Sequence, residues 1–193
     1  MKTQTKTEKA RLRALAECAI MVALAFVLSF IKVWEMPFGG SITLLSMLPI
    51  CIAALRHGTG WGLGAAFVYS ITQALVSGAA GWGLTPTVLV VCYLLDYILA
   101  FTVLGLVGLF KDKGYVKKLS GIFGVCLLRF ICHYISGITI WASSIPEEFA
   151  AQFGNSAYFY SLLYNGGYML PEAVFTVIGA FFVIKAFESR KLL

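Results

Sequence analysis

Six apolar runs divide this chain of 193 residues, and they restrict it to folds that are stable in lipid. Of its residues, 60% are hydrophobic and only 12% are charged, and the mean hydropathy is +0.86. A disordered chain needs low hydrophobicity and high charge, and a soluble domain usually has about a quarter of its residues charged. The sequence therefore predicts an integral membrane protein.

A helix needs about 20 mostly apolar residues to cross the hydrocarbon core of a bilayer. Helices are expected because isolated strands leave backbone groups unsatisfied in lipid, and because the alternating pattern of a barrel is absent. We predict a single all-α domain over residues 1–193, with a basic arm at 1–13 and six transmembrane helices. These are expected at 14–31, 42–55, 60–76, 87–110, 119–141 and 168–187. The second run is short and contains Pro49, so an oblique or kinked crossing is expected there.

The basic residues predict which way the bundle faces. Thirteen of the 15 Lys and Arg residues fall in the arm, in the loops on its side and in the C-terminal tail. The opposite side has only Lys32, beside Glu35, Glu147 and Glu148, and Arg129 lies within a helix. The positive-inside rule then places both termini in the cytoplasm of a multi-pass cell-membrane protein. Three long connections, 32–41, 77–86 and 142–167, would lie outside and favour a binding site that opens outward.

Several functional classes lack their motifs. There is no GxxxxGK[ST] loop for nucleotide hydrolysis and no HExxH, and only two histidines are present. The five cysteines are odd in number and lie in apolar runs, so neither a disulfide framework nor a metal site is implied. Gly60–Ala65 loosely fits a dinucleotide-binding motif but lacks a preceding strand, which favours a helix-packing surface. The net charge is +6, but the basic residues do not form a strip interleaved with aromatic residues, so nucleic-acid binding is not expected. No cofactor is expected either.

Three ionisable residues, Asp96, Arg129 and Glu172, lie inside the expected membrane helices. Such groups are costly in lipid and usually face a cavity or a partner. Asp96 shares one helix face with Tyr93 and Tyr97, because the three are spaced i, i+3, i+4. A purely structural alternative remains open, in which Asp96 pairs with Arg129 between neighbouring helices.

Further polar and aromatic residues fall in the outer half of the expected bundle, notably His133, Trp141 and Asn165. Alone, His133 could be a satisfied interior histidine, and Trp34, Trp82 and Trp141 could be interface anchors. Together with Asp96 they form a zone of one carboxylate, several aromatic faces and hydrogen-bonding groups. That chemistry suits a flat, cationic, nitrogen-rich heterocycle and suits an anion poorly.

These residues resemble the thiamine-specific S components (the ThiT/YuaJ family) of energy-coupling factor (ECF) transporters, over nearly the whole chain. The family's acid followed by Tyr in the fourth helix appears in Leu94–Phe101. Its His and Trp of the fifth helix appear in Cys132–Gly137 and at Trp141. Its Tyr and Asn before the sixth helix appear in Tyr160–Gly166.

The resemblance implies a role for each matching residue. Trp141 would stack on a thiamine ring, while Asp96, His133, Tyr160 and Asn165 would bond the pyrimidine edge or neutralise the thiazolium. Trp34 and Tyr97 would approach the hydroxyethyl end, and Tyr69 and Gln73 are further lining candidates. Asp96 stands where some members have Glu, one methylene longer.

The resemblance also implies partners, because such S components are not enzymes and do not transport alone. They capture thiamine from outside and dock on a transmembrane coupling protein carried by two ATPases. The expected docking surface is a stripe of small residues, Ala19, Ala23 and Val27 on the first helix, since small residues let helices approach closely in lipid. Packing of Ala19 and Ala23 inside the chain's own bundle is the structural alternative.

Three other functions stay open at this point. The chain could be an S component for another small vitamin or precursor, although an anion such as biotin should need a basic pocket residue. It could be an intramembrane enzyme that uses Asp96, Glu172 and His133 as acid–base groups. It could also be a self-sufficient proton-coupled carrier in which Asp96 and His133 titrate.

Overall fold

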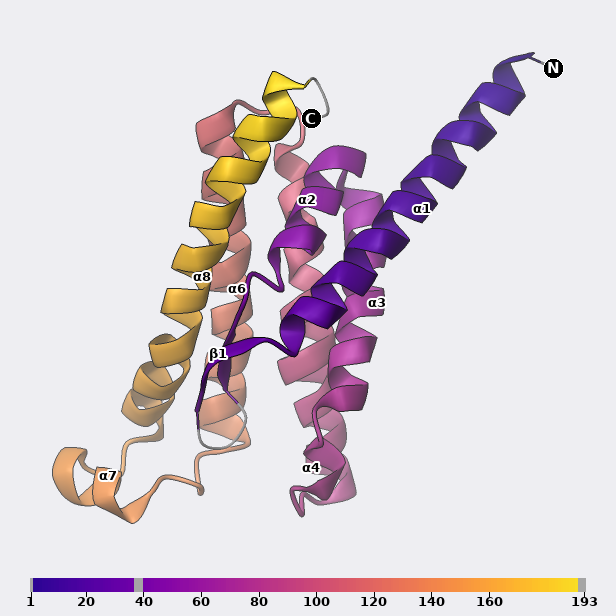
Figure 1. Cartoon of the computed structure of the whole chain (residues 1–193). Coiled ribbons are helices and arrows are strands. Elements are labelled where there is room, and N and C mark those ends of the chain that lie inside the picture. Colours follow the sequence, from indigo (N-terminus) through magenta and orange to yellow (C-terminus); the bar gives the residue numbers. More distant parts are fainter. Residues whose placement is uncertain (1, 37–39, 191–193) are drawn as a thin grey trace.

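The computed structural model describes residues 2–36 and 40–190, most of them in helices that form one bundle (Figure 1). The helices are α1 (Lys2–Ser29), α2 (Leu48–His57), α3 (Thr59–Val76), α4 (Pro86–Cys92), α5 (Ala100–Thr102), α6 (Tyr115–Thr139), α7 (Glu147–Phe153) and α8 (Ala157–Ser189). A π-helical turn, η3 (Tyr93–Leu99), and two 3₁₀ segments, η2 (Ala79–Gly81) and η4 (Val103–Phe110), complete them. Two short strands, β1 (Lys32–Glu35) and β2 (Ser41–Thr43), form an antiparallel hairpin.

Five helical stretches of the described chain are long and apolar enough to cross a membrane. They are Thr7–Ser29, Thr59–Gly81, Pro86–Phe110, Tyr115–Thr139 and Ala157–Ser189. Figure 1 shows that α1 begins and α8 ends at one end of the bundle, while α7 and the start of α4 lie at the other end. Of the basic residues used to predict the orientation, Lys191 and the side chains of Lys2 and Lys6 lie outside the described residues.

The second apolar run does not form the spanning helix expected over 42–55. Ile42 and Thr43 belong to β2, and α2 begins only at Leu48, with Pro49 in its first turn. Proline is tolerated there because the first helical N–H groups have no intrahelical partner. At about 1.5 Å per residue the ten residues of α2 reach only half-way across a 30 Å core. The hairpin precedes this short helix and lies inside the bundle, about midway between its two ends (Figure 1).

The last helix is much longer than the sequence indicated. It begins at Ala157 instead of Tyr168 and includes Pro171. Tyr160 and Asn165, expected in a loop before this helix, therefore lie on its first turns. Conversely, α6 ends at Thr139, so Trp141 lies just beyond the helix that was expected to contain it.

Glycines allow α3 to pack closely against its neighbours. A Cβ atom at Gly62 would lie 2.4 Å from Cβ of Ala54 on α2, and one at Gly105 would lie 2.4 Å from the backbone N of Leu63. A Cβ at Gly108 would lie 2.5 Å from the backbone N of Thr59. The packing interpretation of the Gly60–Ala65 stretch is thus confirmed for Gly62, which contributes to the contact between α2, α3 and η4.

The contact between η4 and α3 predicts a clear cost for adding one methyl group. Gly105→Ala should lower the free energy of unfolding by about 1–3 kcal/mol, because the new Cβ meets backbone atoms that cannot rotate away. Gly124→Ala on α6 is the control, since nothing lies within 4 Å of a Cβ there. Thermal unfolding of the purified variants in detergent measures both; equal melting temperatures would contradict the close packing.

Candidate functional site

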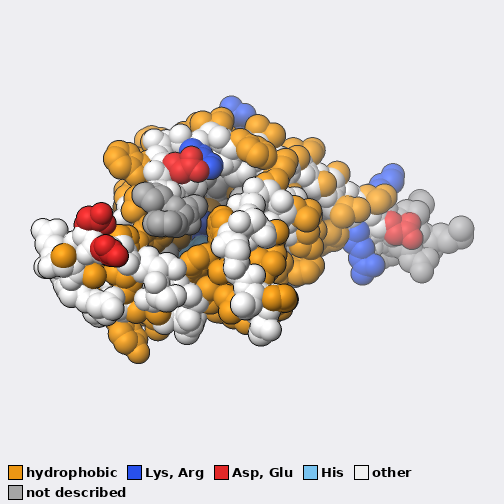
Figure 2. Space-filling view, turned by 90° about the horizontal axis from the view of Figure 1, so that it is seen from below, with side chains coloured by type: hydrophobic (Ala, Val, Ile, Leu, Met, Phe, Trp, Pro, Cys, Tyr) orange, Lys and Arg blue, Asp and Glu red, His pale blue; other side chains and the backbone are white. Residues whose placement is uncertain are grey.

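A cavity of about 290 Å³ lies inside the bundle and opens at the end that carries α7. Its walls come from the hairpin, α3, η3, α6 and α8, and the connections before α4 and after α6 contribute to its mouth. Seen from that end, the surface is hollowed near its centre (Figure 2). The volume is close to the lower limit of typical small-molecule sites, about 300 Å³.

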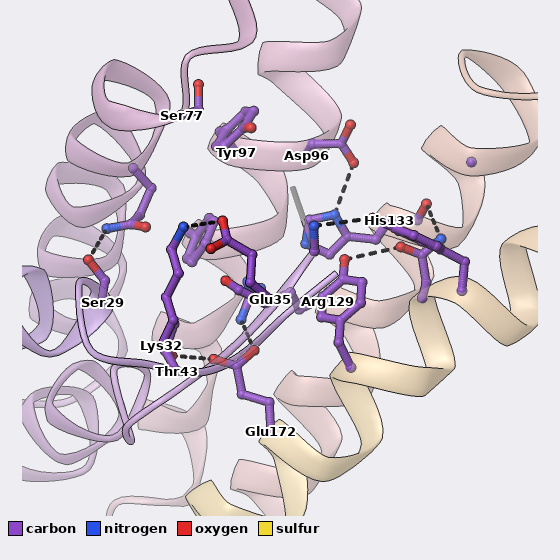
Figure 3. A pocket seen from close by; sticks show the side chains of 18 of the residues that line it. Ser29, Lys32, Glu35, Thr43, Ser77, Asp96, Tyr97, Arg129, His133 and Glu172 are labelled. Carbon is purple, nitrogen blue, oxygen red and sulfur yellow. Dashed lines mark hydrogen bonds and ion pairs between the residues drawn. The ribbon is translucent and has the colours of Figure 1, made fainter. Parts of the chain in front are cut away.

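Asp96 projects into this cavity from the π-helical turn η3. Its carboxylate accepts a hydrogen bond from Nδ1 of His133 at 2.9 Å (Figure 3) and another from the hydroxyl of Ser136. The thiol of Cys92, one turn earlier, lies 3.5 Å from the second carboxylate oxygen. In the neutral tautomer that donates from Nδ1 to Asp96, Nε2 of His133 is an acceptor, and Nε2 is buried with no partner among the described residues.

A pair of oppositely charged side chains lies deeper, at the floor of the cavity. Arg129 on α6 and Glu172 on α8 are both buried, with 3.3 Å between Nη1 and Oε2. The hydroxyl of Thr43 on β2 donates to the other Glu172 oxygen at 2.6 Å, which fixes the hairpin to α8 (Figure 3). The guanidinium also lies over the ring of Phe101, 4.1 Å from its centroid. Arg129 thus pairs with Glu172, and the alternative in which it pairs with Asp96 is wrong.

At the mouth, Lys32 on β1 forms an ion pair with Glu35 of the same strand (Figure 3). The lining therefore contains three carboxylates, of which Glu35 and Glu172 each have a Lys or Arg partner. Among the lining residues that the structure describes, Asp96 is the one carboxylate whose partners carry no permanent charge. Leaving His133 aside, the formal charges of these lining side chains sum to one negative charge.

Aromatic rings form two walls of the cavity. Trp82 and Trp141 meet edge to face at its mouth, with ring centroids 5.4 Å apart. On α8, Tyr160, Tyr164 and Tyr168 succeed one another at intervals of one helical turn, with centroids 5.8 and 6.0 Å apart. These faces are suited to contact a flat ring or a cation.

Asn165 links α6 and α8 behind these rings. Its amide nitrogen donates to the His133 carbonyl at 3.3 Å and to Ser161, and its oxygen accepts from Tyr168 at 3.1 Å. Gly137 permits this close approach, because a Cβ there would lie only 2.1 Å from Oγ of Ser161. Asn165 therefore lines the cavity while most of its hydrogen-bonding capacity is used to hold the two helices together.

The structure brings together seven of the nine residues predicted to line a binding site. Those in the lining are Gln73, Asp96, Tyr97, His133, Trp141, Tyr160 and Asn165. Trp34 instead lies on β1, outside the lining and 62% exposed. Tyr69 also lies outside the lining, because it is fully buried in the core, edge to face with Phe101.

Sequence reasoning gave no ligand role to Trp82, Tyr164 and Tyr168, all of which line the cavity. The two tyrosines follow Tyr160 at i+4 and i+8, a spacing that identifies them as neighbours once the helix is known to begin at Ala157. Trp82 follows a turn near η2 and had no comparable periodicity.

The predicted docking residues Ala19, Ala23 and Val27 are all exposed on α1. They do not pack inside the chain's own bundle, which instead receives Ala14, Cys18, Val22 and Ala25 from the opposite side of the helix. The structure thus leaves a stripe of small side chains free on the surface of α1.

The buried ion pair at the cavity floor predicts strong coupling between its members. Arg129→Met should lower the free energy of unfolding by about 3–5 kcal/mol, because it leaves Glu172 ionised and unpaired in an apolar interior. The double variant Arg129→Met/Glu172→Leu should recover part of this loss, because it removes both charges. Thermal unfolding in detergent gives the three stabilities, and additive losses would contradict the pairing.

The comparisons with known proteins agree with this architecture. The model of the family described as "Thiamine transporter protein (Thia_YuaJ)" matches residues 15–192. Thiamine transporter ThiT of Bacillus subtilis (strain 168) is 33% identical over 180 residues, which cover 85% of this chain and 86% of that protein. ThiT of Lacticaseibacillus paracasei is 28% identical over 189 residues, covering 87% and 85% of the two chains.

A solved structure of ThiT from Listeria monocytogenes has the same fold. It superposes with a TM-score of 0.70 at 26% identity and covers 95% of this chain and 98% of its own. Together with the apolar spanning helices, these similarities make the chain a multi-pass membrane protein and a transporter rather than an enzyme. This chain belongs to the Thia_YuaJ family of thiamine transporters.

Proposed function

We propose that this chain is the thiamine-binding S component of an ECF-type importer, which captures thiamine from outside the cell. The observation that carries the proposal is the charge of the cavity. Asp96 is the one described lining carboxylate without a permanent cation beside it, and aromatic rings surround the same space.

Thiamine carries one permanent positive charge, on its thiazolium ring, and this charge matches the cavity. Binding a monocation would neutralise Asp96 without breaking either of the internal ion pairs at the mouth and the floor. Such a match matters because a charge removed from water is costly unless a partner replaces the water. The faces of Trp141 and Trp82 would add cation–π attraction where the ligand is shielded from solvent.

The hydrogen-bonding groups suit the aminopyrimidine half of thiamine. In this proposal, the unpartnered Nε2 of His133 accepts from the exocyclic amino group, and Asp96 and Tyr160 bond the remaining ring edge. Asn165 holds the adjoining wall in place through its contacts with α6 and α8. Tyr97 and Gln73 complete the lining on the opposite wall.

The distribution of charge supports an outward-facing site. The cavity opens at the end with α7, where Glu147 and Glu148 are exposed, and the basic ends of α2 and α8 lie at the opposite end. If both termini are cytoplasmic, as the positive-inside rule predicts, the mouth faces outward. Both termini can lie on the same side although α2 is only half a span long, because the hairpin and α2 together return the chain to the end at which α1 begins.

The coupling partners are proposed from the surface of α1 and from the missing nucleotide motif. Ala19, Ala23 and Val27 form an exposed stripe on which a helix of a transmembrane coupling protein can pack closely. Two ATPases bound to that protein would supply the energy that this chain cannot obtain by itself.

The alternatives find less support. A vitamin with a carboxylate, such as biotin, would meet Arg129 and Lys32 already paired with Glu172 and Glu35. His133 and Asp96 are within hydrogen-bond distance, as the enzyme alternative required, but the chain belongs to a family of transporters. A proton-coupled carrier would support thiamine uptake in cells that lack the coupling proteins, whereas an S component would not.

Two substitutions test the binding site. Trp141→Ala and Asp96→Asn should each weaken thiamine binding tenfold or more, which corresponds to about 1.4 kcal/mol, because they remove a stacking face and the counter-charge. Glu147→Gln is the control, since that exposed carboxylate lies at the same end but outside the cavity. Calorimetric titration gives the affinities, and unchanged binding in both site variants would refute the assignment.

Docking is tested separately from binding. Ala23→Trp should abolish thiamine uptake by cells that carry the coupling protein and ATPases, because the large ring separates the two helices. The purified variant should still bind thiamine with wild-type affinity, since α1 exposes this position on the outside of the bundle. Leu127→Trp, on the exposed face of α6, is the matched control and should transport normally. Normal uptake by the Ala23 variant would exclude this stripe as the docking surface.

A further inference from the structure

The connection between α6 and α8, residues 140–156, contains a short amphipathic helix that the binding site does not explain. In α7, Glu147 and Glu148 are exposed on one side. Phe149 and Phe153, one turn apart, lie together on the other side. In Figure 1 this helix lies at the end of the molecule away from both termini and projects beyond the bundle. An acidic side and an aromatic side imply that α7 faces two different environments.

The aromatic side of α7 joins two rings from the start of α8. Phe149, Phe153, Phe159 and Tyr160, here called the α7 cluster, contact one another with ring centroids 4.9–6.1 Å apart. The cluster is not sealed, because Phe153 remains 49% exposed and Phe159 40% exposed. Large apolar rings exposed side by side require a partner or an apolar phase.

The exposed surface of α8 indicates that the apolar phase around the α7 cluster is the lipid bilayer. Large apolar side chains are exposed along this helix from Phe159 through Leu163, Leu170 and Val174 to Phe182. The distance from Phe159 to Phe182 along the helix is about 35 Å at 1.5 Å per residue, which matches a tilted crossing of a 30 Å hydrocarbon core. Lys185, one turn beyond Phe182, can extend its ammonium group to the headgroups at that side.

This span places Phe159 at the opposite boundary of the hydrocarbon core. The α7 cluster is continuous with the lipid-facing surface of α8, so it lies at the level where aromatic side chains are enriched in membrane proteins. We propose that α7 is an interfacial membrane anchor, with Phe149 and Phe153 turned toward the lipid and Glu147 and Glu148 toward water.

The anchor lies directly beside the ligand cavity. Phe149 packs edge to face on Tyr160 with centroids 4.9 Å apart, and Tyr160 lines the cavity. The lipid interface would therefore support one wall of the cavity through a single aromatic contact. This inference depends only on the membrane embedding of the family and not on which ligand the cavity binds.

Site-directed spin labelling measures the depth of α7 in the bilayer. The chain carrying Phe153→Cys, or Glu148→Cys as the matched control on the polar side, is labelled with a nitroxide. It is then placed in vesicles of phosphatidylcholine and phosphatidylglycerol. The five described cysteines are buried, so the unmodified chain reports background labelling. Collision rates with oxygen, which concentrates in lipid, and with nickel ethylenediaminediacetate, which stays in water, give a depth parameter for each label.

The anchor predicts a positive depth parameter at position 153 and a negative one at position 148. Equal, water-like values at both positions would overturn the proposal, because α7 would then stand in solvent. A label at position 153 that neither reagent reaches would also overturn it, since protein and not lipid would cover the cluster. Phe159→Cys is a second apolar position and should give the same positive value if the Phe153 variant fails to fold.

Discussion

Pairing of ionised side chains inside an apolar bundle is the constraint on which this structure depends. Neither lipid nor packed helices can solvate a charge, so each buried ionised group needs a partner. Arg129 and Glu172 satisfy this requirement at the floor, and near the opposite end buried Lys118 on α6 pairs with the partly exposed Glu188 on α8. Asp96 has a different environment, because the hydrogen-bond donors His133 and Ser136 carry no permanent positive charge. A cationic ligand would complete the pairing that the protein leaves open.

The same network connects elements that are distant in the sequence. Glu172 bonds Thr43 and so fixes the hairpin, while Asn165 joins α6 to α8 beside His133. Gly137 makes the second link possible by letting the two helices approach. The cavity is thus assembled from the hairpin and four helical segments, and contacts in its wall hold the hairpin, η3, α6 and α8 together. Pre-organisation of this kind reduces the free-energy cost of ordering side chains when a ligand binds.

Much of the fold follows from the sequence, because apolar runs of sufficient length determine most membrane helices. The predicted runs over 60–76, 87–110 and 119–141 agree with the observed helices to within a few residues. The run over 14–31 is also helical, but α1 begins at Lys2 and so includes the expected basic arm. The run over 42–55 was misread because hydropathy does not distinguish a buried strand and a short helix from a spanning helix. The early start of α8 was missed because Asn165, Gly166 and Gly167 resemble a loop, whereas contacts with α6 keep these positions helical.

The sequence predicted most of the residues that line the cavity, but not the contacts between them. Arg129 and His133 lie one helical turn apart on α6, and from the sequence alone a pairing of Asp96 with Arg129 remained open. Which side chain Asp96 contacts depends on the relative depth of η3 and α6 in the bundle, and no local sequence pattern determines that depth. The structure places Asp96 beside His133 and Ser136. Trp34 and Tyr69 were expected in the lining. Their positions depend on the path of the hairpin and on the rotation of α3, both of which are set by tertiary packing.

The most direct test of the central claim is a titration of the purified chain with thiamine, followed through its own tryptophan fluorescence. Two of its four tryptophans, Trp82 and Trp141, line the cavity, so a bound ring should quench them. Saturable quenching at sub-micromolar thiamine, with no response to anionic biotin or to riboflavin, is the expected result. Absence of binding, confirmed by calorimetry, or equal binding of biotin would contradict an account in which the carboxylate of Asp96, which has no Lys or Arg partner, selects a monocation.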